Sequence, residues 1–424
     1  MNILNKLFPK EMLKGYGWFI AFLFFFTTAF FVMQLINNRF WMHDFEVYYS
    51  AATAFVHGDS VYGVPFGLTS GFYKYSPFTL LMYAPFCLVP FFVAKVIHLF
   101  ILGTLLIVNI ISIDKVINRT FFNAASSKRI SLKMFLIFLP LLANVYTEMH
   151  LGNNNTVLLF LNVFALYQLL KGRKLWAGIL FAIAILIKPH FLIFAPLFLL
   201  RKEYKCLFYT FSAVVVGLLI PIVFMGMQYN SQLLNQWVEI MKIHNNGLIY
   251  SPDTLYSWCY ACFGQFMFSD VIKYDKIFGL AILILVSLGI LTMIIFDFRK
   301  EKTQNPIKNY KERNFIFEFF ILLAIIPNIV ETDSEHFLFS IPLIAYIINF
   351  LYSKGELLFF KIIGISLLVL YGMNMRELIG KTLSAAYTAH GVFGLSNILI
   401  VSFCIFIHFK KQNQATPGAE NCTV

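Results

Sequence analysis

Residues 17–36 read GWFIAFLFFFTTAFFVMQLI, an apolar run without a single charged side chain. A helix needs about 20 mostly apolar residues to cross the hydrocarbon core of a bilayer, so this stretch predicts a membrane-spanning helix. Lys6, Lys10 and Lys14 precede the run, and no small-residue cleavage site ends it. The run therefore indicates a retained anchor whose N-terminus faces the cytoplasm, and not a cleaved signal peptide.

The rest of the chain has the same apolar character. Of its 424 residues, 59% are hydrophobic and 13% are charged, whereas soluble domains contain about 25% charged residues. Soluble domains of this total length could not bury so much apolar surface. We expect an all-α polytopic membrane protein with about 12 transmembrane helices (range about 11–13). Further candidate spans lie at 91–113, 206–226, 276–296, 314–330, 337–352 and 391–408, and shorter ones at 134–149, 153–170, 175–187, 190–200 and 357–373.

Basic clusters predict the orientation of these helices, because Lys and Arg favour the cytoplasmic side. If every cluster lies inside, 76–113 crosses once, and residues 76–90 form a re-entrant or interfacial helix on the outer side. Residues 175–200 then form two short crossings that meet at Lys188-Pro189-His190. The clusters lie within 115–133, 171–174, 201–205, 299–313, 354–361 and 410–411.

This orientation accounts for the formal charge of +12. It places 24 Lys and Arg and 9 Asp and Glu on the cytoplasmic side, a net charge of +15. It places 9 Lys and Arg and 12 Asp and Glu on the outer side, a net charge of −3. The basicity is therefore a topology signal and requires no nucleic-acid partner. We expect one integral membrane domain over 1–424, with a cytoplasmic N-terminus (1–16), outer loops at 37–90 and 227–275, and a cytoplasmic tail (409–424).

The first outer loop contains a candidate catalytic carboxylate, Asp44. After it, apolar or aromatic residues recur at 45, 48, 49, 52, 55 and 56, a spacing that predicts an amphipathic helix ended by Gly58. Asp44 could cap this helix by accepting backbone N–H groups of the first turn. It could also take a proton from a sugar hydroxyl at the mouth of a membrane cavity. The two roles are compatible, because a cap would fix the position of the carboxylate.

Two further polar segments are candidates for binding. Lys188 and His190 lie between very apolar half-helices, where cations are costly unless they are paired or face a polar cavity, and such a cationic pair suits a lipid phosphate. Snorkelling of Lys188 toward the membrane surface is the competing explanation. Residues 331–336 (ETDSEH) could bind a divalent cation or sugar hydroxyls, or could be a solvated loop.

Other segments have ordinary structural explanations beside the functional ones. Residues 71–78 (GFYKYSPF) are typical of an aromatic interfacial belt with a proline turn, and 148–155 (EMHLGNNN) of a turn between helices. Cys259 and Cys262 form a lone CxxC, which is weak evidence for a metal site because no second cysteine pair accompanies it.

Taken in order, these segments resemble the polyprenol-phosphate-mannose-dependent alpha-mannosyltransferase family of the C-type glycosyltransferase superfamily. The shared series is DFxVY at 44–48, YxPF at 75–78, GxN at 152–154 and KP at 188–189, and the resemblance covers roughly residues 15–350. In that superfamily an acidic residue of the first outer loop is the catalytic base, a role that the resemblance assigns to Asp44. It also implies a C-type fold, in which amphipathic helices of this loop pack over a cavity open to the outer leaflet.

The resemblance implies transfer of a hexose, with mannose the first candidate, from a polyprenyl-phosphate sugar to a glycan or lipid-linked acceptor, with inversion. Lys188, His190 and His336 would stabilise the donor phosphate. The lipid-linked donor is the expected co-substrate, whether a divalent metal assists stays open, and the expected location is a bacterial inner membrane with both termini in the cytoplasm. Candidate substrate-binding residues are Arg39, Tyr48, Tyr75, Asn154 and His244.

Two other functions remain open at this point. A transporter or flippase of lipid-linked sugars could also have about twelve spans, but it would require charges in mid-membrane and symmetric halves. A C-type glycan polymerase or ligase would be expected to carry larger and more basic outer loops.

Overall fold

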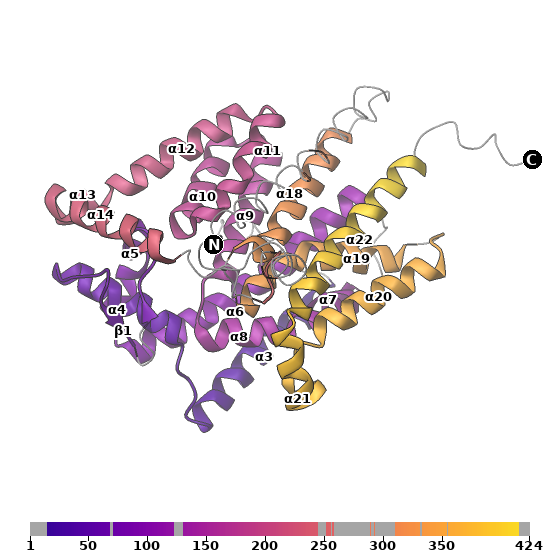
Figure 1. Cartoon of the computed structure of the whole chain (residues 1–424), viewed down its shortest axis with the longest axis horizontal. Coiled ribbons are helices and arrows are strands. Elements are labelled where there is room, and N and C mark those ends of the chain that lie inside the picture. Colours follow the sequence, from indigo (N-terminus) through magenta and orange to yellow (C-terminus); the bar gives the residue numbers. More distant parts are fainter. Residues whose placement is uncertain are drawn as a thin grey trace, which may run out of the picture. The chain divides into compact units, whose positions relative to one another are not determined.

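The computed structural model describes residues 15–67, 71–122, 130–244, 252–255, 257, 289, 292, 310–330, 333–353 and 355–414. The chain divides into two compact units, Met1–Ile113 with Ala125–Asn246, and Asp114–Ala124 with Gly247–Val424. Figure 1 labels α-helices of both units and strand β1. Nearly all of the described secondary structure is helical, as the apolar runs predict.

The first unit begins with the anchor helix and holds the first outer loop. The only described strands form a two-stranded antiparallel hairpin within that loop, a feature that the sequence analysis missed. The elements are α3 (Gly17–Ile36), α4 (His43–His57), β1 (Pro65–Phe66), β2 (Gly71–Phe72), α5 (Pro77–Tyr83), η1 (Ala84–Leu88), α6 (Phe91–Ile117, its end counted with the second unit), α7 (Ile130–Phe138), η3 (Leu139–Leu141), α8 (Leu142–Leu151), α9 (Asn155–Leu170), α10 (Lys174–Ile187), η4 (Pro189–Ile193), α11 (Phe194–Leu200), α12 (Tyr204–Leu219), α13 (Pro221–Met225) and α14 (Met227–His244).

The second unit is built around its last helix, α22, which contacts α18, α19 and α20. Aromatic stacking supports this packing, because the rings of His408 on α22 and Phe317 on α18 lie 3.8 Å apart and nearly parallel. The elements are η2 (Asn118–Phe122), α18 (Tyr310–Ile329), η7 (Ser334–Ser340), α19 (Ile341–Tyr352), α20 (Leu358–Gly372), α21 (Arg376–Ala389) and α22 (Val392–Gln414).

Several helices are long and apolar enough to cross a bilayer, which identifies an integral membrane protein. Within the described ranges six qualify on length and composition alone, so the total of about 12 spans stays a prediction. The candidate span at 276–296 lies outside the described residues. The six are Gly17–Ile36, Phe91–Phe122, Ile130–Leu151, Tyr204–Met225, Ser334–Tyr352 and Val392–Lys411, and shorter apolar helices are Pro77–Leu88, Asn155–Leu170, Lys174–Ile187, Pro189–Leu200 and Leu358–Gly372.

Within the first unit, helix ends that are predicted to lie on the cytoplasmic side of the membrane contact one another. The Ser131 hydroxyl donates a hydrogen bond to the Gly15 carbonyl at 2.7 Å, and both residues belong to segments expected in the cytoplasm. Lys174 and Glu203, from two other predicted cytoplasmic turns, form an ion pair at 2.7 Å. These pairings agree with the relative sidedness that the basic clusters predict.

The two predicted outer loops also meet within this unit. The Tyr229 hydroxyl donates to the Asp59 carbonyl at 2.6 Å, and the Trp237 indole N–H donates to the Lys74 carbonyl at 3.1 Å. Helix α14 of the second outer loop therefore lies against the first outer loop, as two loops on one side of a membrane should. Which side faces outward stays a prediction.

Candidate functional site

Helix α4 carries the candidate base and is fixed on one face by apolar packing. It spans His43–His57 and ends at Gly58, whose φ of 78° is left-handed, so the amphipathic helix predicted from the sequence is confirmed. It contacts α5, η1 and α8. The buried residues that form this face are Phe45, Val47, Tyr48, Ala51, Ala52 and Phe55.

Asp44 is not the N-cap of this helix, which corrects one interpretation of the sequence. The helix begins at His43, and its N-cap is Met42 in a left-handed conformation (φ 53°, ψ 56°) without a side-chain cap bond. The sequence did not reveal this because Met rarely occupies such a conformation. Asp44 is half-buried in the first turn, where the positive end of the helix dipole stabilises a carboxylate.

A cluster of hydroxyl groups surrounds the start of α4. The hydroxyls of Tyr48 and Tyr75 lie 2.9 Å apart, and the Tyr48 hydroxyl donates to Oδ1 of Asn153 at 3.3 Å. The Tyr83 hydroxyl donates to Oδ1 of Asn154. Burial raises the pKa of the Tyr48 and Tyr75 phenols, and the nearby negative charge of Asp44 raises the pKa of both further. The charge of Asp44 therefore acts on hydroxyls that burial keeps neutral.

The buried tyrosines of the first outer loop predict a loss of stability at alkaline pH. Burial raises the pKa of Tyr48, Tyr62, Tyr73 and Tyr75, so the folded chain holds them neutral while the unfolded chain ionises them near pH ~10. Their contribution to stability is thus fully present below pH ~10 and is lost as the pH rises toward the folded pKa values. We expect the unfolding temperature of the purified protein to fall steeply above pH ~10.

The fall in unfolding temperature with pH should become shallower in Tyr73→Phe. Phenylalanine has no phenol to ionise, so one of the groups that favour the unfolded chain at alkaline pH is removed. The exposed Tyr204, on α12, provides the control substitution Tyr204→Phe, which should leave the slope unchanged. Intrinsic fluorescence during heating at a series of pH values measures both slopes. Equal slopes in the two variants would contradict the assignment of the alkaline loss to the buried loop tyrosines.

The turn between α8 and α9 packs directly against the start of α4. Gly152 ends α8 with a left-handed φ of 69°, and a Cβ placed there would lie 2.7 Å from Met42 Cε and 2.8 Å from Phe45 Cβ. His98 Nε2 lies 3.1 Å from the Gly152 carbonyl oxygen, which holds the turn from the side of α6. Gly152 thus permits the close approach of this turn to Met42 and Phe45 at the start of α4.

Substitution of Gly152 should disturb this approach measurably. Gly172 has a similar φ of 73°, but a Cβ there would meet nothing within 4 Å. Gly172→Ala should therefore cost only the left-handed penalty of about 1–2 kcal/mol. Gly152→Ala should cost about 1–3 kcal/mol more, because it also overpacks the contact with α4. The comparison of unfolding temperatures tests this, and equal losses would show that the α4 contact adjusts freely.

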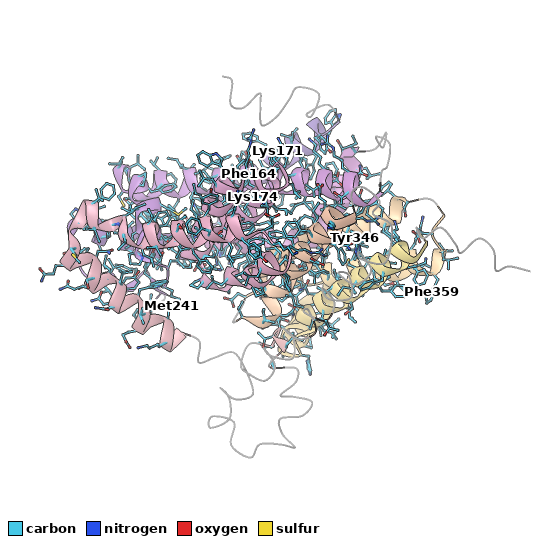
Figure 2. All side chains as sticks on the ribbon, turned by 90° about the horizontal axis from the view of Figure 1, so that it is seen from above. Phe164, Lys171, Lys174, Met241, Tyr346 and Phe359 are labelled. Carbon is cyan, nitrogen blue, oxygen red and sulfur yellow. The ribbon has the colours of Figure 1, made fainter. Side chains whose placement is uncertain are left out.

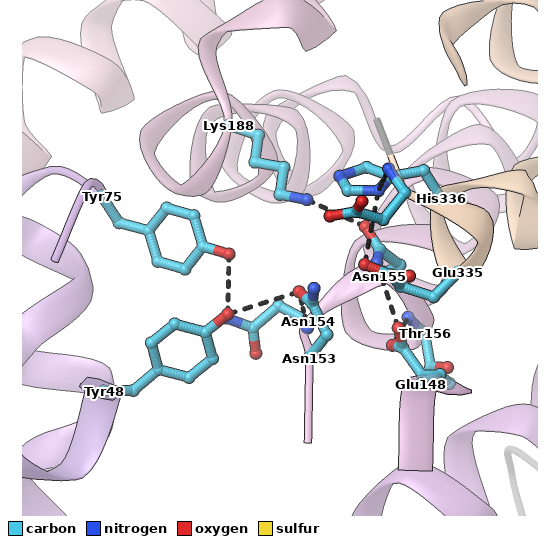
Figure 3. A network of polar contacts seen from close by, with 11 residues as sticks. Tyr48, Tyr75, Glu148, Asn153, Asn154, Asn155, Thr156, Lys188, Glu335 and His336 are labelled. Atoms are coloured by element: carbon cyan, nitrogen blue, oxygen red, sulfur yellow. Dashed lines mark hydrogen bonds and ion pairs between the residues drawn. The ribbon is translucent and has the colours of Figure 1, made fainter. Parts of the chain in front are cut away.

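A chain of polar contacts connects this turn to Lys188 (Figure 3). The Lys188 ammonium donates to Oδ1 of Asn155 at 2.9 Å, and Nδ2 of Asn155 donates to Oε2 of Glu148 at 3.0 Å. The backbone N–H of Thr156 donates to Oε1 of Glu148 at 2.6 Å. Lys188 is 9% exposed and Glu148 is 1% exposed, so the ammonium does not reach open solvent. Snorkelling therefore does not describe Lys188, which is buried and bonded at the junction of α10 and η4.

The turn 152–155 thus joins two groups of predicted site residues. Asn153 bonds to Tyr48 on one side, and Asn155 bonds to Lys188 on the other. Figure 3 shows both halves of the network around Asn153, Asn154 and Asn155. From the sequence alone, Glu148 and Asn155 are predicted only as turn residues. The signal that could have identified them is the cost of a carboxylate at the end of an apolar helix, which requires a buried partner.

The remaining predicted residues occupy less informative positions. His190, in η4, lies beside Phe191 with 4.8 Å between ring centroids, and Arg39 is exposed between α3 and α4. His336 belongs to the second unit, where its Nδ1 accepts the Asp333 N–H at 3.3 Å and lies 3.7 Å from Glu335 Oε1. It completes a capping box at the start of η7. His244 ends α14, and its side chain lies outside the described residues.

No candidate metal centre is present among the described residues, where no three His, Cys, Asp or Glu side chains group as metal ligands. Within 331–336, Asp333 and His336 cap η7 instead, and Glu331 lies outside the described residues. Cys259 and Cys262 also lie outside them.

Comparison with known protein families gives one match. A family model described as glycosyltransferase family 87 matches residues 72–306, more than half of the chain. The matched range contains Tyr75, Glu148, the turn 152–155 and Lys188, and it begins after Asp44. No curated protein matches the chain.

Proposed function

Because the chain belongs to glycosyltransferase family 87, a family of polyprenol-phosphate-mannose-dependent mannosyltransferases of the C type, we propose that it transfers a hexose from a polyprenyl-phosphate donor. Mannose is the first candidate for the sugar, and a glycan or a lipid-linked glycan on the outer face is the acceptor. The family is one of enzymes, which favours transfer over transport of lipid-linked sugars.

The observation that carries this proposal is the connected network of the first unit. It contains the hydroxyls of Tyr48 and Tyr75, whose pKa the charge of Asp44 raises, and it leads through the turn 152–155 to the ammonium of Lys188. Transfer from a sugar phosphate needs a base for the attacking hydroxyl and a cation for the departing phosphate. Asp44 is proposed as the base, and Lys188, which belongs to the hydrogen-bonded network, as the cation.

In the proposed reaction, the acceptor oxygen attacks the anomeric carbon of the donor sugar. Asp44 accepts the proton of that hydroxyl as the new carbon–oxygen bond forms, because the hydroxyl becomes strongly acidic only in the transition state. The bond from the anomeric carbon to the phosphate oxygen breaks on the opposite face, so the configuration inverts. The electron pair leaves with the polyprenyl phosphate.

Lys188 is suited to stabilise the leaving phosphate. An ammonium donates strong, charge-assisted hydrogen bonds to phosphate oxygens, and the bond to Oδ1 of Asn155 fixes the position of this one. Burial at 9% exposure strengthens the interaction relative to water. Asn155 and Glu148 hold the ammonium in place before the donor binds, which reduces the cost of ordering it. His190 is a further candidate for this phosphate, and His336, in the second unit, is a phosphate-binding candidate by sequence alone.

The hydroxyls and amides near Asp44 are proposed to contact the sugar and the acceptor. The central candidates are Tyr48, Tyr75 and Asn154. The hydroxyls of Tyr48 and Tyr75 contact each other, and Oδ1 of Asn154 accepts a hydrogen bond from the Tyr83 hydroxyl. Arg39 and His244 are candidates by sequence position alone.

A donor comparison tests the proposal. The purified full chain, in vesicles, is given labelled polyprenyl-phosphate mannose, polyprenyl-phosphate glucose or a nucleotide-activated mannose, together with glycan and lipid-linked acceptors. We expect labelled product from the polyprenyl-phosphate mannose and none from the nucleotide sugar. Product from the nucleotide sugar alone, or translocation of the lipid-linked sugar without any product, would overturn the proposal.

A further inference from the structure

An open groove of about 400 Å³ lies between α9 and α10, away from the network described above. Its walls are apolar. Four residues of α10 with the spacing i, i+3, i+4, i+7 form one wall, and a phenylalanine of α9 faces them. These residues are Trp176, Ile179, Leu180, Ile183 and Phe164.

The polar end of the groove is a fixed turn with a cation. Gly172 adopts a left-handed φ of 73°, and the Arg173 N–H donates to the Gln168 carbonyl at 2.9 Å, as in a Schellman motif. The neighbouring lysines are engaged, since Lys171 lies over the Tyr167 ring at 4.3 Å and Lys174 pairs with Glu203. Among the described residues, the exposed Arg173 guanidinium has neither an ion pair nor a hydrogen bond. It is therefore available to an anion at the mouth of the groove.

A second polar group lines the same groove. Gln168 is 8% exposed, and its Oε1 is buried with no hydrogen-bond partner among the described residues. Leaving such an acceptor unsatisfied costs about 1–3 kcal/mol. A ligand that donates a hydrogen bond here would remove that cost.

We propose that this groove binds an anionic glycerophospholipid with a hydroxyl-bearing headgroup. One acyl chain lies between α9 and α10, the phosphate pairs with Arg173, and a headgroup hydroxyl donates to Oε1 of Gln168. Arginine is well suited to the phosphate because its guanidinium can bind two oxygens at once. Phe164, Lys171 and Lys174 mark this part of the first unit in Figure 2.

This lipid is distinct from the sugar donor. Arg173 precedes α10 and Lys188 follows it, so the 14 residues of the helix separate the two cations. At 1.5 Å per residue that separation is roughly 20 Å, which is more than the thickness of one leaflet, about 15 Å. The groove therefore binds lipid from the leaflet opposite to the candidate site, and the inference does not rest on the transferase activity.

Native mass spectrometry of the full chain tests the proposal. The protein is equilibrated with vesicles of phosphatidylglycerol, which has an anionic, hydroxyl-bearing headgroup, or of phosphatidylcholine, which has a zwitterionic headgroup without a donor. We expect one retained phosphatidylglycerol, with an affinity about tenfold above that for phosphatidylcholine, a ratio that corresponds to one favourable charged contact. Equal retention of the two lipids would overturn the assignment.

Three variants locate the site. Arg173→Gln, at an exposed position that should not affect folding, should lower phosphatidylglycerol affinity about tenfold, and Ile183→Trp should abolish retention of both lipids by filling the groove. Lys205→Gln removes an exposed cation from the neighbouring α12 and should retain lipid like the wild type. Unchanged unfolding temperatures in detergent confirm that the variants fold. Wild-type retention by Arg173→Gln and Ile183→Trp would overturn the proposal, and so would one-for-one displacement of phosphatidylglycerol by polyprenyl phosphate.

Discussion

Asp44→Asn is expected to lower kcat by about 10²–10⁴-fold, the usual contribution of a general base, and to leave the unfolding temperature nearly unchanged. The amide preserves the size of the side chain but cannot accept the proton of the acceptor hydroxyl. Because Met42 and not Asp44 occupies the N-cap position, the substitution removes no capping side chain from α4. The initial rate of sugar transfer from polyprenyl-phosphate mannose, with saturating acceptor, measures the effect.

Glu46 provides a matched control for this prediction. It is the other carboxylate in the first turn of α4, and it is half-buried like Asp44. Its Oε2 lies 3.8 Å from Nδ1 of His43. Glu46→Gln removes the same charge from the same turn and should retain most of the activity. If both variants lost activity equally, the loss would come from the negative charge of the first turn as a whole and not from a proton transfer to Asp44. If Asp44→Asn transferred sugar at the wild-type rate, the catalytic assignment would be lost.

Lys188→Met is expected to reduce both stability and activity. Removal of one partner from a buried charged network costs about 3–5 kcal/mol, and Lys188→Met takes away the donor to Oδ1 of Asn155 together with a positive charge that acts on the buried Glu148. The unfolding temperature in detergent should therefore fall clearly. The loss of activity alone would not identify a phosphate contact, since a damaged fold also lowers the rate.

The double variant Lys188→Met with Glu148→Gln separates the two effects. It replaces the buried charges by a neutral pair, and neutral replacements of buried ion pairs are often well tolerated. We expect the unfolding temperature to recover while transfer stays low, because the cation for the leaving phosphate is still missing. Recovery of activity together with stability would show that Lys188 serves the fold alone.

The helices could be predicted from the sequence because their signals are local. The apolar run at 17–36 has the bounds of α3, and the spacing of apolar residues after Asp44 predicts α4 with its end at Gly58. The break at Lys188 between two short helices is also visible, because a cation and a proline interrupt the apolar pattern. Each of these features depends on residues within a few positions of one another.

The connections of the site could not be predicted, because they join distant parts of the chain. The bond from Tyr48 to Asn153 spans 105 residues, and the bond from Lys188 to Asn155 spans 33. No local pattern pairs Glu148 with Asn155 and Lys188. The sequence also suggested a cap for α4 at Asp44, because a left-handed Met42 is an unusual choice for that position.

The anomeric configuration of the product tests the central claim most directly, because it reports how Asp44 takes part in the reaction. The purified chain is given polyprenyl-phosphate mannose with a β-linked sugar, and the linkage in the product is determined by NMR spectroscopy. A single displacement with Asp44 as the base predicts an α-linked product. A β-linked product would contradict it, because a single displacement from the opposite face inverts the anomeric carbon.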